Sequence, residues 1–114
     1  MVAPVICRST QGDTSQPAAA FLARHDPADP AVSPLRADLR GLPPALIQVG
    51  SSETLLDDAV RLAGALGAAE VRTTLEVWPH MIHAWMLWSA RLEAGRAASE
   101  GAAAWLRTAL SKAE

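Results

Sequence analysis

The sequence predicts an α/β fold in which a strand, a helix, a second strand and a second helix follow one another. The first strand is indicated by a nearly continuous apolar run at residues 45–49, which is typical of a strand buried on both faces of a parallel sheet. The second is indicated by alternation from Arg72 to Trp78, which predicts a less deeply buried strand. A helical pattern separates the two runs, and this order favours parallel pairing.

The 114 residues suffice for one domain of ordinary size. Residues 1–16 show no sustained period of 2 or 3.6, so we expect an irregular N-terminal arm there and the domain proper at 17–114. Pro17 predicts the first turn of a short helix that ends near Ala23, because proline loses no hydrogen bond at such a position.

Three prolines between residues 25 and 35 exclude a helix, because the residue before a proline is pushed into an extended conformation. We expect an ordered loop that is packed by Val32 and Leu35. A second glycine- and proline-containing break, at residues 41–44, precedes the first strand.

Two helices are predicted from apolar positions spaced by three and four residues. The first has the stripe Leu56, Ala59, Val60, Ala63 and Leu66, and is expected to end near Gly67. The second has the stripe Ala102, Trp105, Leu106 and Ala109 near the end of the chain, and an interruption is expected at Gly95 or Gly101.

Composition limits the classes of function. Half the residues are hydrophobic, the net charge is −2 and no basic stripe occurs, so we expect no nucleic-acid partner. No stretch approaches the roughly 18 apolar residues of a membrane span, and the first residues do not resemble a signal peptide. The single Cys7 excludes an internal disulfide and suggests neither a metal nor another cofactor. A cytoplasmic location is therefore expected.

Each predicted strand is followed by a loop with residues suited to catalysis. Glu53 follows the first strand, and His80 and His83 follow the second. Chemistry in open parallel sheets sits at the carboxyl ends of strands, and histidine titrates near neutral pH, as a general base requires. By residue chemistry alone, the two histidines are equally good partners for the acid.

A metal interpretation of this trio is weaker. Two histidines and a carboxylate can bind zinc with an open position. Here the histidines are three residues apart in a turn that contains Pro79, unlike the helical His-Glu-x-x-His motif. The sequence therefore predicts no metal centre from Glu53, His80 and His83.

Several short motifs occur in an order that is typical of one known family. They are Phe21-Leu22, Asp26-Pro27, Ser33-Pro34-Leu35, Gly41-Leu42-Pro43-Pro44, Val49-Gly50, Leu55, Asp57-Asp58 and Met81-Ile82-His83. On these motifs the chain, between about Ala18 and Leu110, resembles the C-terminal portion of the hormone-sensitive-lipase-like esterases, which are α/β-hydrolases that cleave carboxylic esters. The resemblance implies the strand-helix-strand-helix end of an α/β-hydrolase parallel sheet, without its nucleophile-bearing half.

The resemblance assigns roles to individual residues. Glu53 falls on the family's catalytic acid, although aspartate is usual there, and its extra methylene requires a shifted backbone or rotamer. His83 falls on the catalytic histidine, which takes the proton of a serine, so the resemblance favours it over His80. Asp57 matches the second acid of the motif, for which a helix N-cap or first-turn role is the simpler explanation.

The nucleophile of the family is missing from this sequence. Neither Gly-x-Ser-x-Gly nor a His-Gly-Gly segment occurs, and Ser51 and Ser52 lie beside the acid with no second glycine after them. The resemblance therefore implies an incomplete ester hydrolase that is inactive alone: a truncated reading frame, a gene remnant or a subunit completed by another chain. Once completed, it would take a small apolar ester.

An alternative function belongs to a different class. The first strand, buried on both faces, needs a neighbour that the sequence does not obviously supply. The chain would then be a non-catalytic remnant or interaction module whose open sheet edge docks onto a partner chain or onto a second copy in a homo-oligomer.

Four large apolar side chains surround the histidines in sequence: Trp78, Met81, Trp85 and Trp88. They would either line a pocket for the acyl or alcohol group of an ester or pack the edge of the core. Packing is the commoner role of tryptophans near a strand end.

Overall fold

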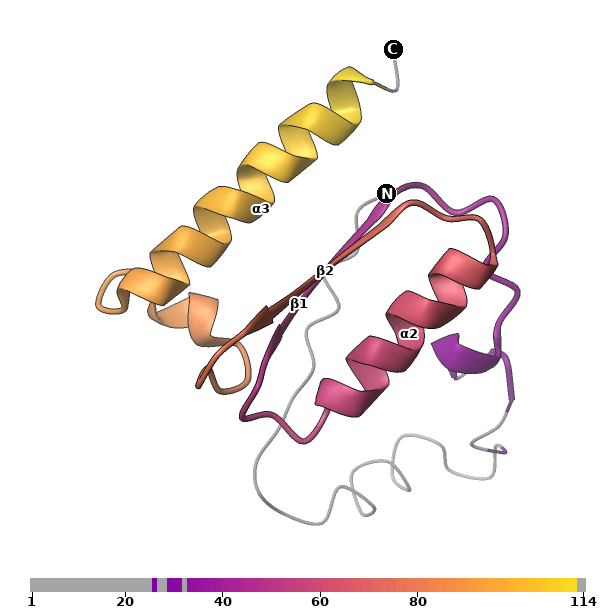
Figure 1. The fold of residues 1–114 in the computed structure, drawn as a ribbon, viewed down its shortest axis with the longest axis horizontal. Coiled ribbons are helices and arrows are strands. Elements are labelled where there is room, and N and C mark those ends of the chain that lie inside the picture. Colours follow the sequence, from indigo (N-terminus) through magenta and orange to yellow (C-terminus); the bar gives the residue numbers. More distant parts are fainter. Residues whose placement is uncertain (1–25, 27–28, 32, 113–114) are drawn as a thin grey trace.

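The computed structural model describes residues 26, 29–31 and 33–112, and it places two parallel strands between helices (Figure 1). The elements are the 3₁₀ helix η1 (Pro34–Arg36), strand β1 (Ala45–Gly50), helix α2 (Leu56–Ala68), strand β2 (Thr73–Trp78), the 3₁₀ helix η2 (Trp85–Trp88) and helix α3 (Glu93–Ser111). The predicted arm, the helix predicted from Pro17 and the predicted packing of Val32 lie outside the described residues.

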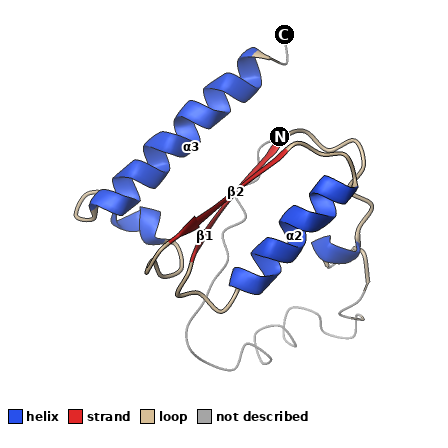
Figure 2. Cartoon of the chain, viewed as in Figure 1, coloured by secondary structure: helices blue, strands red, loops and turns tan. Residues whose placement is uncertain are grey.

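Strand β1 pairs in parallel with β2, in a register that runs from Ala45 opposite Thr73 to Gly50 opposite Trp78. The strands lie between α2 on one side and α3 with η2 on the other (Figure 2). The predicted order of strand, helix, strand and helix is thus confirmed. Because the pairing is parallel and in step, both strands end at the same edge of the sheet.

Strand β1 is covered on both faces, as its apolar composition predicts. Ile47 and Val49 are each 1% exposed and pack in a cluster on the α2 side of the sheet. Successive strand residues point to opposite faces, so buried Leu46 and half-buried Gln48 share the α3 side, where Gln48 Nε2 donates to Ala98 O over 3.0 Å. The other buried members of the α2-side cluster are Leu39, Ala59, Leu62, Leu66 and Val71.

The buried face of α2 differs from the predicted stripe. Ala59, Leu62 and Leu66 are buried, whereas Val60 is 48% exposed. The centre of the buried face lies near Leu62, and Val60 is turned by about two helical steps of roughly 100° each from that position. The prediction of Val60 as a core residue is wrong because another apolar stripe on the same helix faces the sheet.

Strand β2 is less deeply buried than β1, as predicted. Its first four residues and Trp78 are half-buried, and Val77 is 44% exposed. Helix α3 lies over this strand, and Trp105 Nε1 donates a hydrogen bond of 3.2 Å to Thr74 Oγ1. The C-terminal helix therefore contacts both strands of the sheet.

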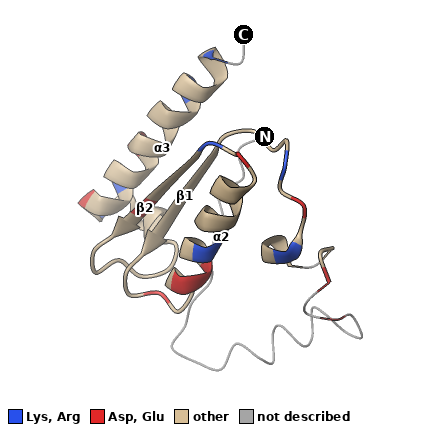
Figure 3. Cartoon of the chain, turned by 45° about the vertical axis from the view of Figure 1, so that its right-hand side comes forward, with Lys and Arg blue, Asp and Glu red and all other residues tan. Residues whose placement is uncertain are grey.

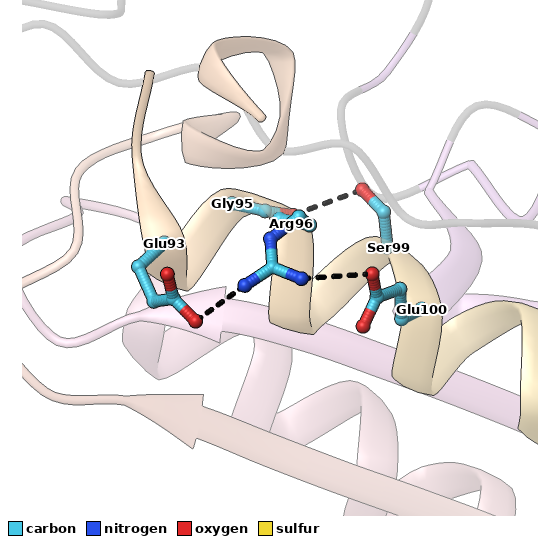
Figure 4. A network of polar contacts seen from close by, with 5 residues as sticks. All are labelled: Glu93, Gly95, Arg96, Ser99 and Glu100. Atoms are coloured by element: carbon cyan, nitrogen blue, oxygen red, sulfur yellow. Dashed lines mark hydrogen bonds and ion pairs between the residues drawn. The ribbon is translucent and has the colours of Figure 1, made fainter. Parts of the chain in front are cut away.

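Helix α3 continues through Gly95 and Gly101, so the predicted interruption at a glycine is wrong. Exposed ion pairs brace its first turns, because the Arg96 guanidinium reaches carboxylates at both i−3 and i+4 (Figure 4). Each such pair stabilises a helix by about 0.2–0.5 kcal/mol. The two distances from Arg96 are 2.6 Å to Glu93 and 3.3 Å to Glu100.

Gly95 also has a packing reason to be glycine. A Cβ atom at this position would lie 2.8 Å from Trp85 O and 3.1 Å from Ser89 N, both backbone atoms. One turn further along, Ala98 is fully buried, and Ser99 Oγ donates to Gly95 O over 3.0 Å. The small residues let α3 approach η2 and the sheet closely.

Charged side chains of both signs mix on the described surface. Figure 3 shows acidic and basic residues side by side at the start of α2, where Asp57 and Arg61 form an ion pair of 2.9 Å. Among the described residues, none of the helices is long and apolar enough to cross a membrane. The cytoplasmic location stays a prediction.

The two glycines of α3 provide a matched test of this packing. Gly95→Ala is expected to lower the free energy of unfolding by about 1–3 kcal/mol, because the backbone of η2 must move away from the new methyl group. Gly101→Ala meets open space and is expected to raise it by up to about 1 kcal/mol. Urea unfolding of both variants measures the difference, and equal effects would contradict the close contact.

Candidate active site

The loops that leave β1 and β2 are bonded to each other through their backbones. Ser51 N–H donates to Trp78 O over 2.9 Å, and Ser52 N–H donates to Met81 O over 3.1 Å. The in-step register places the two loop starts side by side, which makes these bonds possible. The residues that follow each strand are therefore held against one another.

Gly50 permits this close approach. A Cβ atom at position 50 would collide with the carbonyl oxygen of Met81 and lie 2.6 Å from its carbonyl carbon. It would also lie 3.2 Å from Glu53 Oε2. Any residue other than glycine would push the two loops apart.

The structure brings Glu53 and His83 together at this edge. His83 Nδ1 lies 2.8 Å from Glu53 Oε1, and Glu53 Oε2 accepts a short hydrogen bond from Gly50 N–H. The carboxylate side chain is 2% exposed and the imidazole 15% exposed. Both carboxylate oxygens therefore have a donor in a largely dry setting.

This geometry determines which ring nitrogen carries the proton. A carboxylate only accepts hydrogen bonds, so the hydrogen between His83 and Glu53 belongs to Nδ1. In the neutral ring Nε2 is then the acceptor and can take a proton from another group. The pair can thus orient an imidazole and stabilise the imidazolium that proton transfer creates.

His80 has a different environment. It is exposed and adopts a left-handed backbone conformation with φ of 62°, and its N–H donates to Ser51 Oγ over 2.8 Å. A left-handed position costs a residue other than glycine about 1–2 kcal/mol. The structure thus pairs the acid with His83, while His80 forms the turn that leads to it.

The two serines of the Glu53 loop contact the neighbouring loop. Ser51 Oγ accepts a hydrogen bond from the His80 backbone N–H, and Ser52 donates its own backbone N–H to Met81 O.

The structure also bears on the metal alternative. Within the described part of the chain, histidine, cysteine, aspartate and glutamate side chains nowhere gather in threes that could hold a metal ion. Glu53, His80 and His83 therefore do not form a candidate metal centre.

Two of the tryptophans pack behind the His83 loop. Trp85 is 1% exposed, and its Nε1 donates to Ala94 O over 3.2 Å. The Trp78 ring lies 5.8 Å from it between centroids, and Trp78 Nε1 donates to Glu76 Oε2 over 3.2 Å. For Trp78 the packing interpretation describes the structure, and Trp85 is packed as well, although it also borders the hollow next to the loop.

An open hollow lies next to the same loop, with a volume of about 340 Å³. Met81, Trp85 and Trp88 line it, whereas Trp78 does not, and Trp88 is 57% exposed. Its remaining lining residues are His80, Ile82, Arg91 and Leu92. Three of the four predicted pocket residues thus border an apolar hollow, although His83 is not part of its lining.

Asp57 occupies the first turn of α2 rather than the N-cap. The N-cap position belongs to Leu55, which makes no side-chain cap, and Asp57 pairs with Arg61 on the exposed side of the helix. The first-turn explanation is confirmed and the N-cap explanation is wrong.

Sequence reasoning missed two contributors to the site. One is the close approach at Gly50, although a glycine directly before an acid-bearing loop is a signal of close backbone approach. The other is the bond between the Ser51 hydroxyl and His80, which depends on a contact between loops that a single sequence does not reveal.

Comparison with known families identifies the class of protein. A family described as alpha/beta hydrolase fold matches residues 7–87, so the chain belongs to the α/β hydrolases. An acetyl-hydrolase of Streptomyces hygroscopicus is 48% identical over 97 residues, which cover 85% of this chain and 32% of the relative. An esterase of Acinetobacter venetianus is 44% identical over 64 residues, 56% of this chain and 21% of the relative.

Solved structures narrow the assignment to one branch. An esterase/lipase from an uncultured bacterium superimposes with a TM-score of 0.82 at 38% identity, over 84% of this chain and 33% of that structure. The hormone-sensitive lipase homologue EstE7, from a metagenome library, gives 0.80 at 34% identity, over 82% and 32%. The chain is thus a member of the hormone-sensitive-lipase-like esterases and spans about a third of the length of these relatives.

Replacement of Gly50 tests the contact between the loops. Gly50→Ala is expected to lower the free energy of unfolding by at least about 2 kcal/mol, because the new methyl group meets backbone rather than a flexible side chain. Gly64→Ala, in an open position on α2, is the control and is expected to be neutral or stabilising. Urea unfolding of both variants makes the comparison, and a Gly50→Ala protein as stable as the unmodified chain would contradict the contact.

Proposed function

We propose that this chain supplies the catalytic acid and the catalytic histidine of a serine carboxylic-ester hydrolase. The observation that carries the proposal is the 2.8 Å contact between His83 Nδ1 and the buried Glu53 carboxylate at the ends of adjacent parallel strands. Glu53 holds the imidazole in the tautomer whose Nε2 accepts a proton. His83 takes the proton of a serine hydroxyl and returns it to the leaving alcohol.

Glutamate is compatible with this role. The two oxygens of its carboxylate have separate partners, because Oε2 accepts Gly50 N–H while Oε1 faces His83 Nδ1. Both oxygens have donors, which lowers the cost of burying the carboxylate. The departure from the usual aspartate therefore leaves the acid able to orient His83.

The nucleophile and the oxyanion donors belong to a segment outside these 114 residues. The sequence contains no Gly-x-Ser-x-Gly, and the hydroxyl of Ser51 lies against the backbone of the His80 turn. Without a nucleophile and without donors for the oxyanion, the acid–histidine pair has little to act on. The chain alone is therefore an incomplete hydrolase.

The substrate class is a carboxylic ester with a small apolar group. The relatives are called an acetyl-hydrolase and esterases, and the hollow beside the His83 loop has an apolar lining. Such linings suit the apolar parts of ester substrates. Membership in an esterase family favours this function over the docking module that the open sheet edge also suggests.

The first test is ester hydrolysis by the purified chain. We expect p-nitrophenyl butyrate to be cleaved no faster than in buffer, by the chain and by His83→Ala alike, because no nucleophile is present. Release of p-nitrophenol followed at 405 nm is a convenient measurement. Activity that disappears in His83→Ala would contradict the incomplete hydrolase and reveal a nucleophile within this chain.

The second test restores the missing part. The matched 97-residue segment of the Streptomyces acetyl-hydrolase is replaced by the corresponding segment of this chain, and the chimaera is expected to hydrolyse p-nitrophenyl butyrate. Glu53→Gln is expected to lower kcat by about 10⁴-fold and His83→Ala by about 10⁶-fold, as loss of the acid and of the histidine of a triad do. Glu100→Gln, an exposed carboxylate on α3, is the matched control.

Three results would overturn this assignment. A folded but inactive chimaera, or one whose turnover survives His83→Ala, would exclude His83 as the base. A larger loss in His80→Asn than in His83→Ala would transfer the role to His80. Asparagine is chosen at position 80 because it tolerates the left-handed backbone found there.

A further inference from the structure

We propose that Ser51 is a positioning residue that fixes the His83 loop through the backbone of His80. The inference rests on the proposed function of His83 and adds the group that places its imidazole. Ser51 Oγ accepts a hydrogen bond of 2.8 Å from the N–H of His80, which follows Ser51 by 29 residues in the sequence. This contact ties the loop of the acid to the loop of the histidine.

Ser51 forms two hydrogen bonds with the start of the His83 loop. Its own N–H donates to Trp78 O over 2.9 Å, and its hydroxyl accepts from His80 N–H, so the two bonds fall on either side of Pro79. The backbone bond is available to any residue except proline, whereas the second bond needs a hydroxyl. A hydroxyl at position 51 is thus required for the bond to the His80 turn.

The turn needs such support because of its backbone. His80 has φ of 62° and Ala84 has φ of 54°, and both are left-handed positions that residues with a Cβ atom rarely adopt. Conformations of this kind persist where the surrounding structure holds them. His83 lies between these two positions, so its place depends on how firmly the turn is kept.

The acid is rigidly connected to the same residue. Glu53 follows Ser51 by two residues, its carboxylate accepts Gly50 N–H, and its other oxygen meets His83 Nδ1 at 2.8 Å. Loss of the bond between His80 N–H and Ser51 Oγ would allow the turn to move and would shift the His83 imidazole relative to the Glu53 carboxylate, which Gly50 N–H holds in place. Small displacements of a catalytic group cause large losses of rate.

Three variants separate positioning from other roles of Ser51. Ser51→Ala removes the acceptor of the His80 N–H, and Ser51→Thr retains a hydroxyl. Ser52→Ala is the matched control, because the adjacent serine contributes its N–H to the loop contact, which alanine preserves. A nucleophilic Ser51 would not be rescued by threonine in the same way, because the added methyl group crowds the attacking oxygen.

The first readout is the Nδ1–H proton of His83 in the 114-residue chain, observed by NMR and assigned by its loss in His83→Ala. We expect a protected downfield signal in the unmodified chain, in Ser52→Ala and in Ser51→Thr. In Ser51→Ala the signal should broaden or vanish through exchange with water, while the dispersion of backbone amide signals stays unchanged. An unchanged signal in Ser51→Ala, or an equal loss in Ser52→Ala, would overturn the proposal.

The second readout is kinetic and uses the chimaera described above. Ser51→Ala is expected to lower kcat by about tenfold with KM changed less than about twofold, and Ser51→Thr is expected to restore most of the rate. Failure of threonine to rescue would count against positioning by the hydroxyl. If the unmodified chimaera is inactive, the proposed function fails, while the imidazole signal of the chain alone still decides the role of Ser51.

Discussion

The pairing of Gly50 with Trp78 at the ends of the two strands determines how the two loops that follow the strands contact each other. Parallel strands in step deliver their next residues to one edge, and the loop backbones then bond to each other directly. The absence of a side chain at Gly50 lets the carbonyl of Met81 come close enough for this. A shift of one residue in register would separate the acid from the histidine and turn every β2 side chain to the opposite face.

A buried carboxylate is stable at this edge because the fold surrounds it with donors. Glu53 receives one hydrogen bond from the backbone of its own loop and one from His83 on the neighbouring loop. An uncompensated buried charge would be strongly destabilising, so the contact that suits catalysis also makes burial of this residue tolerable. Loop structure and proposed chemistry therefore depend on the same two bonds.

The sequence predicts the strands well because their signals are local. The apolar run at 45–49 and the alternation that ends at Trp78 locate β1 and β2 to within one residue of their observed bounds. The apolar face of α2 was harder to place, since Val60 fits a helical stripe as well as Leu62 does, and only the orientation of the helix on the sheet decides between them.

The site residues also differ in how well local sequence signals predict them. Residue chemistry could not choose between His80 and His83, because the choice depends on a left-handed turn at His80 that no local pattern specifies. The family resemblance chose His83, and the structure brings that residue to Glu53. The predicted interruption of the C-terminal helix at Gly95 is wrong because a glycine that weakens a helix locally also permits close packing, here against η2.

The described part of the chain holds the Glu53–His83 pair together with the interactions that shape it. The bonds that position Glu53 and His83 lie at two adjacent strand ends, within a segment about a third as long as its relatives. A two-stranded sheet is marginal by itself, and here helices cover both of its faces while β1 has one strand neighbour among the described residues. The geometry of the pair is thus local, because it depends only on two adjacent strand ends and on the loops that follow them.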